Sequence, residues 1–222
     1  VLEALTETWP EEPDVRTALS DLRMRQDRPE EAWEHAMIII ESDPVHAGAL
    51  AAAQRAGLVL DRHAELLSLY QAAYIHQPSA WITEEIDAME LAMELEKARE
   101  LWSSEGVDEA AAAIEKAAAR YGIQDGRPWV QIGGAWMSID QPQRALQAFE
   151  LAHELDPGDP GAVEGMSGAW WVMGRFSPAE EVLSDHWSRH GDLAIGAELA
   201  RVQVRRGHRV EAQDTLAALM RA

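Results

Sequence analysis

Residues 126–159 read GRPWVQIGGAWMSIDQPQRALQAFELAHELDPGD, and this stretch decides the fold. Its marker residues, in chain order, are Trp129, Ile132, Gly133, Trp136, Ala145, Phe149 and Pro157. Gly133 and Ala145 stand at equivalent points of two successive helical segments, and a small residue at each of these points lets two helix backbones approach closely. Pro157 marks the loop after the second helix, because proline cannot continue a helix. The stretch therefore predicts a pair of closely packed helices.

This order of aromatic, aliphatic, glycine, aromatic, alanine, aromatic and proline residues resembles the tetratricopeptide repeat (TPR) family, whose repeat length it also shares. In such arrays one repeat is too small to bury its own apolar face, so neighbouring repeats stack to build a continuous core. The resemblance implies an all-α fold, a right-handed α-solenoid of stacked antiparallel helix pairs. It extends over nearly the whole chain and is weakest in residues 79–105.

The spacing of prolines predicts the repeat boundaries. Pro10, Pro44 and Pro78 recur at equal intervals of one repeat length, as expected for the loop after the second helix of each repeat. We expect one TPR-like array over residues 1–222, with residues 1–12 as the end of a truncated repeat and a natural protein that extends beyond this N-terminus. The predicted repeats span residues 13–46, 47–80, 81–125, 126–159, 160–192 and 193–222.

Two of these repeats depart from the pattern. The repeat at 81–125 contains an insertion, and residues 79–105 are predicted to form one lengthened helix, or two joined by a slight kink, starting near Thr83. In the repeat at 47–80, Gln54 and Leu66 occupy the positions of the close crossing, where small residues are expected, so this repeat should pack more loosely or at a different angle. The rule holds for Ser20 and Ala32, Gly133 and Ala145, Ser167 and Ala179, and Ala200 and Ala212.

Composition excludes several classes of partner and site. The chain has 39 acidic residues against 19 lysines and arginines, and a formal net charge of −20 argues against nucleic acid or an anionic membrane as a partner. It has no cysteine, which excludes disulfides, thiolate metal ligands and cysteine nucleophiles. No apolar run approaches the roughly 18 to 20 residues that span a bilayer, so no membrane insertion of this segment is expected. The sequence is compatible with a soluble segment in the cytoplasm or the periplasm and does not choose between them.

Two histidines are the strongest candidates for a metal site. His186 and His190 lie four residues apart, with Asp185 beside them, and this spacing places both imidazoles on one helix face. No third ligand is evident at helical spacing, and His186 stands where the repeat normally has alanine. We therefore interpret them as packed or rim histidines and expect no metal.

No catalytic or cofactor site is predicted elsewhere. Gly133-Gly134 lacks the lysine and the serine or threonine of a nucleotide-binding loop, and close helix packing explains it. The acidic side chains between Glu84 and Glu100 are interpreted as a solvated helix face rather than as paired catalytic carboxylates. We expect a protein without cofactors and without enzymatic activity.

The resemblance also implies a binding surface. In the TPR family, positions 2, 5, 9, 12 and 13 of the first helix line the concave face on which ligands commonly dock. Carrying these positions over gives Arg55 and Arg201 at position 9, Met24, Leu58, Met137 and Trp171 at position 12, and Arg25 and Arg205 at position 13. The planar fork of arginine suits carboxylates.

These residues lead to a functional hypothesis with alternatives. We expect a protein interaction or assembly scaffold whose concave face captures a peptide or protein partner, with acidic groups or a free C-terminus as the favoured ligand. Alternatively, the arginines pair with glutamates on neighbouring helices and bind nothing. Two further alternatives are a self-associating module that forms homo-oligomers through exposed array ends, and a regulatory or substrate-presenting domain of a larger enzyme.

Overall fold

The computed structural model describes residues 12–121 and 126–221, and every regular element in these ranges is a helix. It divides into two compact units, Val1–Met93 and Glu94–Ala222, which are described separately. The expected truncated repeat at residues 1–12 lies outside the described residues, apart from Glu12. The all-α prediction is confirmed.

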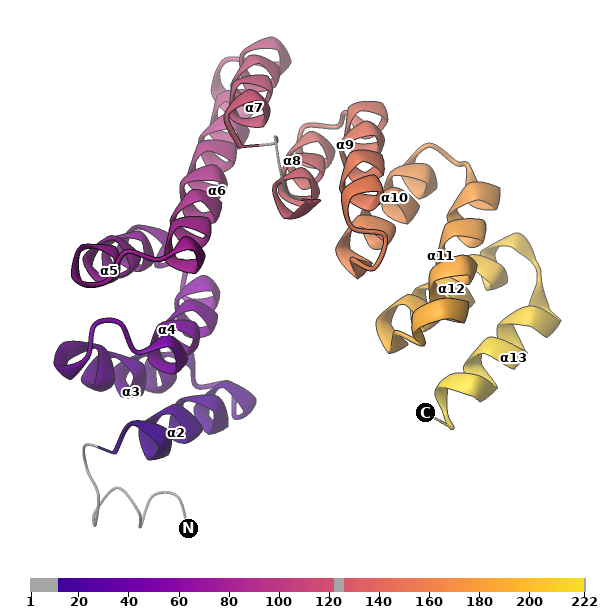
Figure 1. Cartoon of the computed structure of the whole chain (residues 1–222). Helices are drawn as coiled ribbons and strands as arrows, with labels where there is room; N and C mark the ends of the chain where they lie inside the picture. Colours follow the sequence, from indigo (N-terminus) through magenta and orange to yellow (C-terminus); the bar gives the residue numbers. More distant parts are fainter. Residues whose placement is uncertain (1–11, 122–125, 222) are drawn as a thin grey trace. The chain divides into compact units, whose positions relative to one another are not determined.

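The helices follow one another in pairs joined by short turns (Figure 1). The first unit contains α2 (Pro13–Arg25), α3 (Pro29–Ser42), α4 (Ala47–Val59), α5 (His63–His76) and the start of α6 (Ala80–Ser104). The second unit contains the rest of α6 and then α7 (Val107–Tyr121), α8 (Gly126–Ser138), α9 (Pro142–Leu155), α10 (Pro160–Val172), α11 (Phe176–His190), α12 (Leu193–Arg206) and α13 (Arg209–Leu219).

The turn inside five helix pairs is built in the same way. One residue in each turn adopts a positive φ, and these residues are Asp27, Asp61, Asp140, Gly174 and Gly207, with φ of 58°, 58°, 59°, 71° and 83°. Glycine reaches this left-handed region without steric cost, and aspartate is among the few other residues that tolerate it. The repeated turn fixes the angle at which each second helix folds back on the first.

Close helix crossings depend on small residues, as the sequence predicts. A Cβ atom added at Gly133 of α8 would lie 2.5 Å from Cε1 of Phe149 on α9, so no larger residue fits without displacing the ring. Gly165 of α10 faces the same ring, at 2.3 Å. In the first unit, the Ser20 hydroxyl donates a hydrogen bond to the Ala32 carbonyl oxygen across the α2–α3 crossing, over 2.9 Å.

The α4–α5 pair has its close helix crossing at a different position. Leu66 is fully buried and approaches Gly57, where an added Cβ would lie 2.8 Å from Cδ1 of Leu66. The close approach thus occurs at Gly57, three residues after Gln54. The Gln54 side chain instead donates to Oε2 of Glu85 (2.6 Å) and accepts from the Tyr70 hydroxyl (3.2 Å).

The insertion forms a single long helix. α6 runs from Ala80 to Ser104 over 25 residues and begins three residues before the predicted start at Thr83. Of the two predicted alternatives, one lengthened helix and two joined helices, the structure has the first. Among the described residues, no helix is both long and apolar enough to span a membrane.

Candidate binding surface

The predicted site residues belong to both units, and their contacts differ between the first unit and the second. Arg55 on α4 forms an ion pair with Asp21 on α2, with 2.5 Å between Nη2 and Oδ1. Both residues occupy position 9 of their repeats. The guanidinium of Arg55 is therefore already paired with a carboxylate, which is the arrangement that the alternative hypothesis expects.

The other first-unit candidates form no cluster with Arg55. Met24 is half-buried and packs against the core of that unit, whereas Leu58 is 50% exposed. Arg25 is exposed and makes no ion pair with any described residue. Of these side chains, only Arg25 offers an unengaged charge to a ligand.

The second unit brings two predicted residues into direct contact. The guanidinium of Arg201 on α12 lies over the indole ring of Trp171 on α10, with Cζ 4.8 Å from the ring centroid. The indole also contacts Phe176, the first residue of α11, whose ring packs against it in a T-shaped arrangement with 5.0 Å between centroids. Trp171 thus joins three successive helices on this surface.

Glu198, one turn before Arg201, orients the guanidinium. Its carboxylate accepts hydrogen bonds from Nε of Arg201, at 2.9 Å, and from Nη2. The hydrogen bonds to Glu198 raise the pKa of the Arg201 guanidinium. Burial acts in the opposite direction and has a smaller effect. A guanidinium held on one edge by a carboxylate and on one face by an indole keeps its Nη1 donors available in a fixed direction.

Further side chains on α10 and α12 complete the surface. Val172 and Val204 are 55% and 59% exposed, and Arg205 is exposed and makes no ion pair with any described residue. Trp171, Val172, Arg201, Val204 and Arg205 together are called the α10–α12 patch below. Met137 on α8 is half-buried, and the structure gives it no contact with the patch.

Negative charge gathers towards the other end of the same helices. The pKa of Glu164 on α10 is raised, first by burial and then by the carboxylates of Asp192, Glu198 and Asp159. Asp159 and Asp192 are the N-caps of α10 and α12. The surface is therefore acidic near the helix N-termini and carries its arginines near the C-termini.

Two glycines leave helix positions without side chains, Gly168 on α10 and Gly134 on α8. A Cβ added at Gly134 of α8 or at Gly168 of α10 would meet no atom within 4 Å. Both glycines occupy position 9 of their repeats, where the first unit has Asp21 and Arg55. Unlike Gly133 and Gly165, they are not required by packing, and they leave bare backbone on this face.

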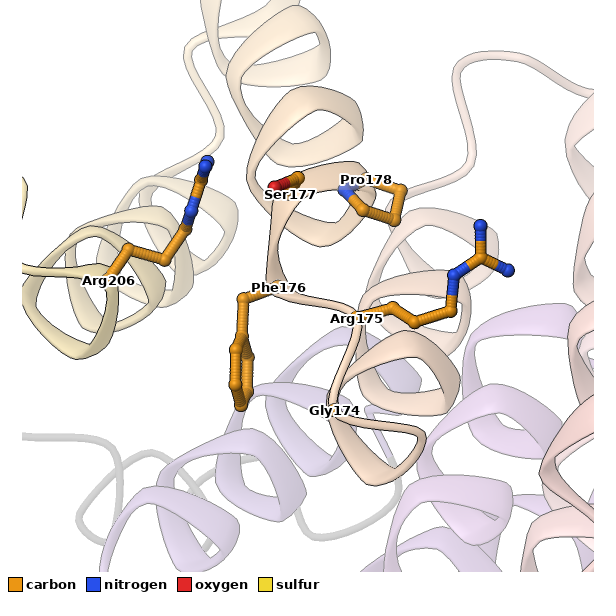
Figure 2. Close-up of a pocket in the computed structure, with 6 residues that line it drawn as sticks. All are labelled: Gly174, Arg175, Phe176, Ser177, Pro178 and Arg206. Atoms are coloured by element: carbon orange, nitrogen blue, oxygen red, sulfur yellow. The ribbon is translucent and has the colours of Figure 1, made fainter.

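A shallow pocket adjoins the patch at the α10–α11 turn. It has a volume of about 390 Å³ and is lined by Gly174, Arg175, Phe176, Ser177, Pro178 and Arg206 (Figure 2). Arg206 is engaged by Glu180, with 2.5 Å between Nη1 and Oε2, whereas Arg175 makes no ion pair with any described residue. Phe176 lines the pocket and contacts Trp171, so pocket and patch share one aromatic residue.

Sequence reasoning missed Phe176 and Glu198. Glu198 precedes Arg201 by three residues on one helix, and this spacing is a recognised signal for an ion pair. Phe176 carried no such signal, because its contact with Trp171 depends on how the α10–α11 turn is folded.

Among the described residues, no group of three or more histidine, cysteine, aspartate or glutamate side chains is arranged to hold a metal ion. His186 is buried, with 4% of its surface exposed.

Comparison with known proteins identifies the architecture. No protein-family model and no curated protein sequence matches this chain. Among solved structures, TTC0263, a thermophilic TPR protein of Thermus thermophilus, is similar at 15% identity and a TM-score of 0.57, over 86% of this chain and 99% of that one. A chain of the APC/C hetero-tetramer Cut9-Hcn1 is similar at 14% identity and a TM-score of 0.54, over 99% of this chain and 42% of that one. Taken with the helix pairs and their small-residue crossings, these similarities show that the chain has the tetratricopeptide-repeat fold.

Proposed function

We propose that this chain is a non-catalytic protein-binding scaffold and that the α10–α12 patch captures an acidic segment of a partner protein. The observation that carries the proposal is the arrangement of Arg201, which contacts Trp171 and Glu198 and keeps its Nη1 donors available, one helical turn from Arg205, which makes no ion pair with any described residue. Two guanidinium groups on one helix face, beside exposed valines, suit a ligand with carboxylates next to an apolar side chain.

The charge distribution supports an orientation for this segment. Its acidic groups would lie at Arg201 and Arg205, away from Glu164 and the N-cap aspartates, which repel carboxylates. The bare backbone at Gly168 would allow a bound chain to approach α10 closely. Because the whole chain carries a net charge of −20, binding of an acidic peptide depends on these local contacts rather than on long-range attraction.

The test uses an array of synthetic peptides that pair glutamate or aspartate with one large apolar residue, each with a free or an amidated C-terminus. The best binder is then titrated by fluorescence anisotropy against the whole chain. We expect the double variant Trp171→Ala, Arg205→Glu to bind it at least about tenfold more weakly, since two hot-spot contacts of roughly 1 kcal/mol or more are lost.

The matched control is Arg209→Glu, which makes the same charge change at an exposed arginine of α13 outside the patch. If the patch double variant and this control bind the peptide equally, the assignment of the patch is wrong. A preference for the free C-terminus over the amide would identify a terminal carboxylate as one of the bound groups.

Self-association is a second candidate function, and the exposed apolar side chains of the last helix pair favour it. Val210 and Leu216 on α13 are 68% and 46% exposed, and Met220, which follows the helix, is 83% exposed. A second copy of the chain could bury them. Light scattering over a concentration series tests this, and a constant monomer mass would exclude it, as would an oligomer that persists unchanged in Leu216→Lys, Met220→Lys.

A further inference from the structure

Three histidines lie near enough to interact electrostatically where the second helices of two repeats end. His186 and His190 lie one turn apart on α11, with ring centroids 4.4 Å from each other and ring planes tilted by 32°. His153 lies in the last turn of α9. The Nδ1 atoms of His153 and His186 are enclosed by protein and make no hydrogen bond with any described residue. The three side chains are called the histidine cluster below.

The charged groups around His186 come from every element that surrounds it. His190 lies on its own helix, His153 on α9, Asp159 at the start of α10 and Asp192 at the start of α12. Burial is the largest effect and lowers the pKa of His186, as do the two other histidines, whereas the two aspartates oppose this shift.

The two aspartates are already engaged in capping. Oδ1 of Asp159 accepts a hydrogen bond from the backbone N–H of Gly161, at 2.8 Å. Oδ1 of Asp192 accepts one from the N–H of Ala194, at 2.9 Å. In both aspartates the cap uses one carboxylate oxygen, Oδ1, which fixes the position of the carboxylate beside the cluster.

The cluster adjoins the junction through which α12 docks on α11. α11 ends at His190 and is followed by its C-cap Gly191, in left-handed conformation with φ of 66°, and α12 is capped by the next residue, Asp192. Next to His186, the Trp187 ring packs so closely on α12 that a Cβ added at Gly196 would lie 2.7 Å from Cζ3 of the indole. A disturbance at His186 or His190 thus acts directly on the α11–α12 contact.

We propose that the histidine cluster makes the docking of α12 on α11 dependent on pH, with neutral imidazoles keeping it closed and protonation loosening it. A proton on His186 creates a buried cation, whose ring lies 4.4 Å from that of His190. Because the folded-state pKa of His186 lies below its unfolded value, its stabilising effect is complete above about pH 6.5 and is lost as the pH falls through the folded pKa.

Hydrogen exchange of the whole chain, measured by mass spectrometry and corrected for intrinsic rates, tests the proposal peptide by peptide. Between about pH 7.5 and about pH 5.5, we expect amides of α11 and α12 to open several-fold more often, with tenfold as the effect of one full pKa unit. Amides of α8 serve as the internal reference, because they belong to the same unit and lie outside the cluster.

Variants separate the cluster from other acid effects. His186→Gln alters a buried position and could unfold the repeat, so the decisive variant is His153→Gln, His190→Gln, which removes both neighbouring imidazoles and leaves His186 in place. We expect this double variant to lose most of the acid-induced opening, and the NMR titration of His186 to move to higher pH. The control His76→Gln changes an exposed histidine on α5 and should respond like the natural sequence.

Two results would overturn the proposal. One is a natural sequence whose α11 and α12 amides open no more often at the lower pH than at the higher one. The other is a double variant that opens as strongly on acidification as the natural sequence. Both results are independent of peptide binding, so they leave the proposed function of the patch untouched.

Discussion

The guanidinium of Arg201 lies over the indole face of Trp171, with its Cζ 4.8 Å from the ring centroid, and its Nε–Nη2 edge donates to the carboxylate of Glu198. Its side chain is 59% exposed, so these contacts stabilise the fold little. Exposed ion pairs contribute about 0 to 1 kcal/mol and exposed cation–π contacts about 0.5 to 1 kcal/mol. The arrangement mainly fixes the direction of the arginine.

We therefore expect Arg201→Lys to separate binding from stability. Lysine keeps the charge but has no planar fork to share with Glu198 and stack on Trp171. The free energy of unfolding, measured with urea, should change by less than about 1 kcal/mol, whereas binding of an acidic peptide should weaken several-fold. Unchanged affinity would show that only the charge of Arg201 matters.

Neighbouring glycines on α8 provide a matched pair for the packing of the repeat. Gly133→Ala places a Cβ against the Phe149 ring and should destabilise the chain by about 1 to 3 kcal/mol. Gly134→Ala meets open space and should stabilise it by up to about 1 kcal/mol, because alanine is the better helix former. Thermal denaturation of both variants checks this. Equal effects would show that the register of α8 against α9 is wrong.

The double variant Gly134→Ala, Gly168→Ala also tests whether the exposed helix backbone at these two glycines contributes to peptide binding. If a bound peptide approaches the helices there, adding two methyl groups should raise stability and weaken binding in the same protein. Titration of the double variant with the peptide selected on the array measures this. Binding as tight as that of the natural sequence would show that the two glycines do not contribute to peptide binding.

The left-handed turn residues predict opposite effects for opposite substitutions. Asp140→Gly relieves a non-glycine residue at φ of 59° and should be neutral or stabilising, by at most about 1 kcal/mol. Gly174→Ala places a non-glycine residue at φ of 71° and should destabilise the fold by about 1 to 2 kcal/mol. Urea denaturation distinguishes the two. A neutral Gly174→Ala would mean that this turn relaxes to another conformation.

The sequence predicts the helix pairs well, because they depend on local spacing. Gly133, Ala145 and Phe149 carry both the helical period and the steric requirement for a close crossing, and the structure has that crossing. Conversely, the use of Gly57 rather than Gln54 at the α4–α5 crossing could not be predicted. Both residues lie on a plausible face, and only the position of Leu66 decides between them.

The candidate site was predictable only in part. Family positions placed Trp171 and Arg201 on neighbouring helices, and the structure brings them together. The same positions did not indicate which arginine would pair with a carboxylate, as Arg55 does with Asp21, because ion pairs between repeats depend on side-chain rotamers and on charges one repeat away. The contact between Phe176 and Trp171 could not be predicted, because it depends on the geometry of the α10–α11 turn. Side-chain direction, rather than helix position, is what the sequence alone left undetermined.

We expect His35 to make the first unit sensitive to acid for a different reason. Nδ1 of His35 on α3 lies 3.1 Å from Nη1 of Arg16 on α2, so the neutral ring accepts a hydrogen bond from the arginine. Burial lowers the pKa of His35, and the charges of Arg16 and Arg23 lower it further, against smaller opposing effects of Glu31 and Glu34. Protonation would replace this hydrogen bond with the repulsion of two cations.

Since the folded-state pKa of His35 lies below its unfolded value, the stabilisation is complete above about pH 6.5 and disappears as the pH falls through the folded pKa. Amides of α2 and α3 should accordingly lose protection on acidification, and His35→Gln, which retains an acceptor for Arg16, should remove most of that loss. Hydrogen exchange resolves these helices from α11 and α12. If α2 and α3 in His35→Gln still open on acidification as in the natural sequence, the acid response of this unit arises elsewhere.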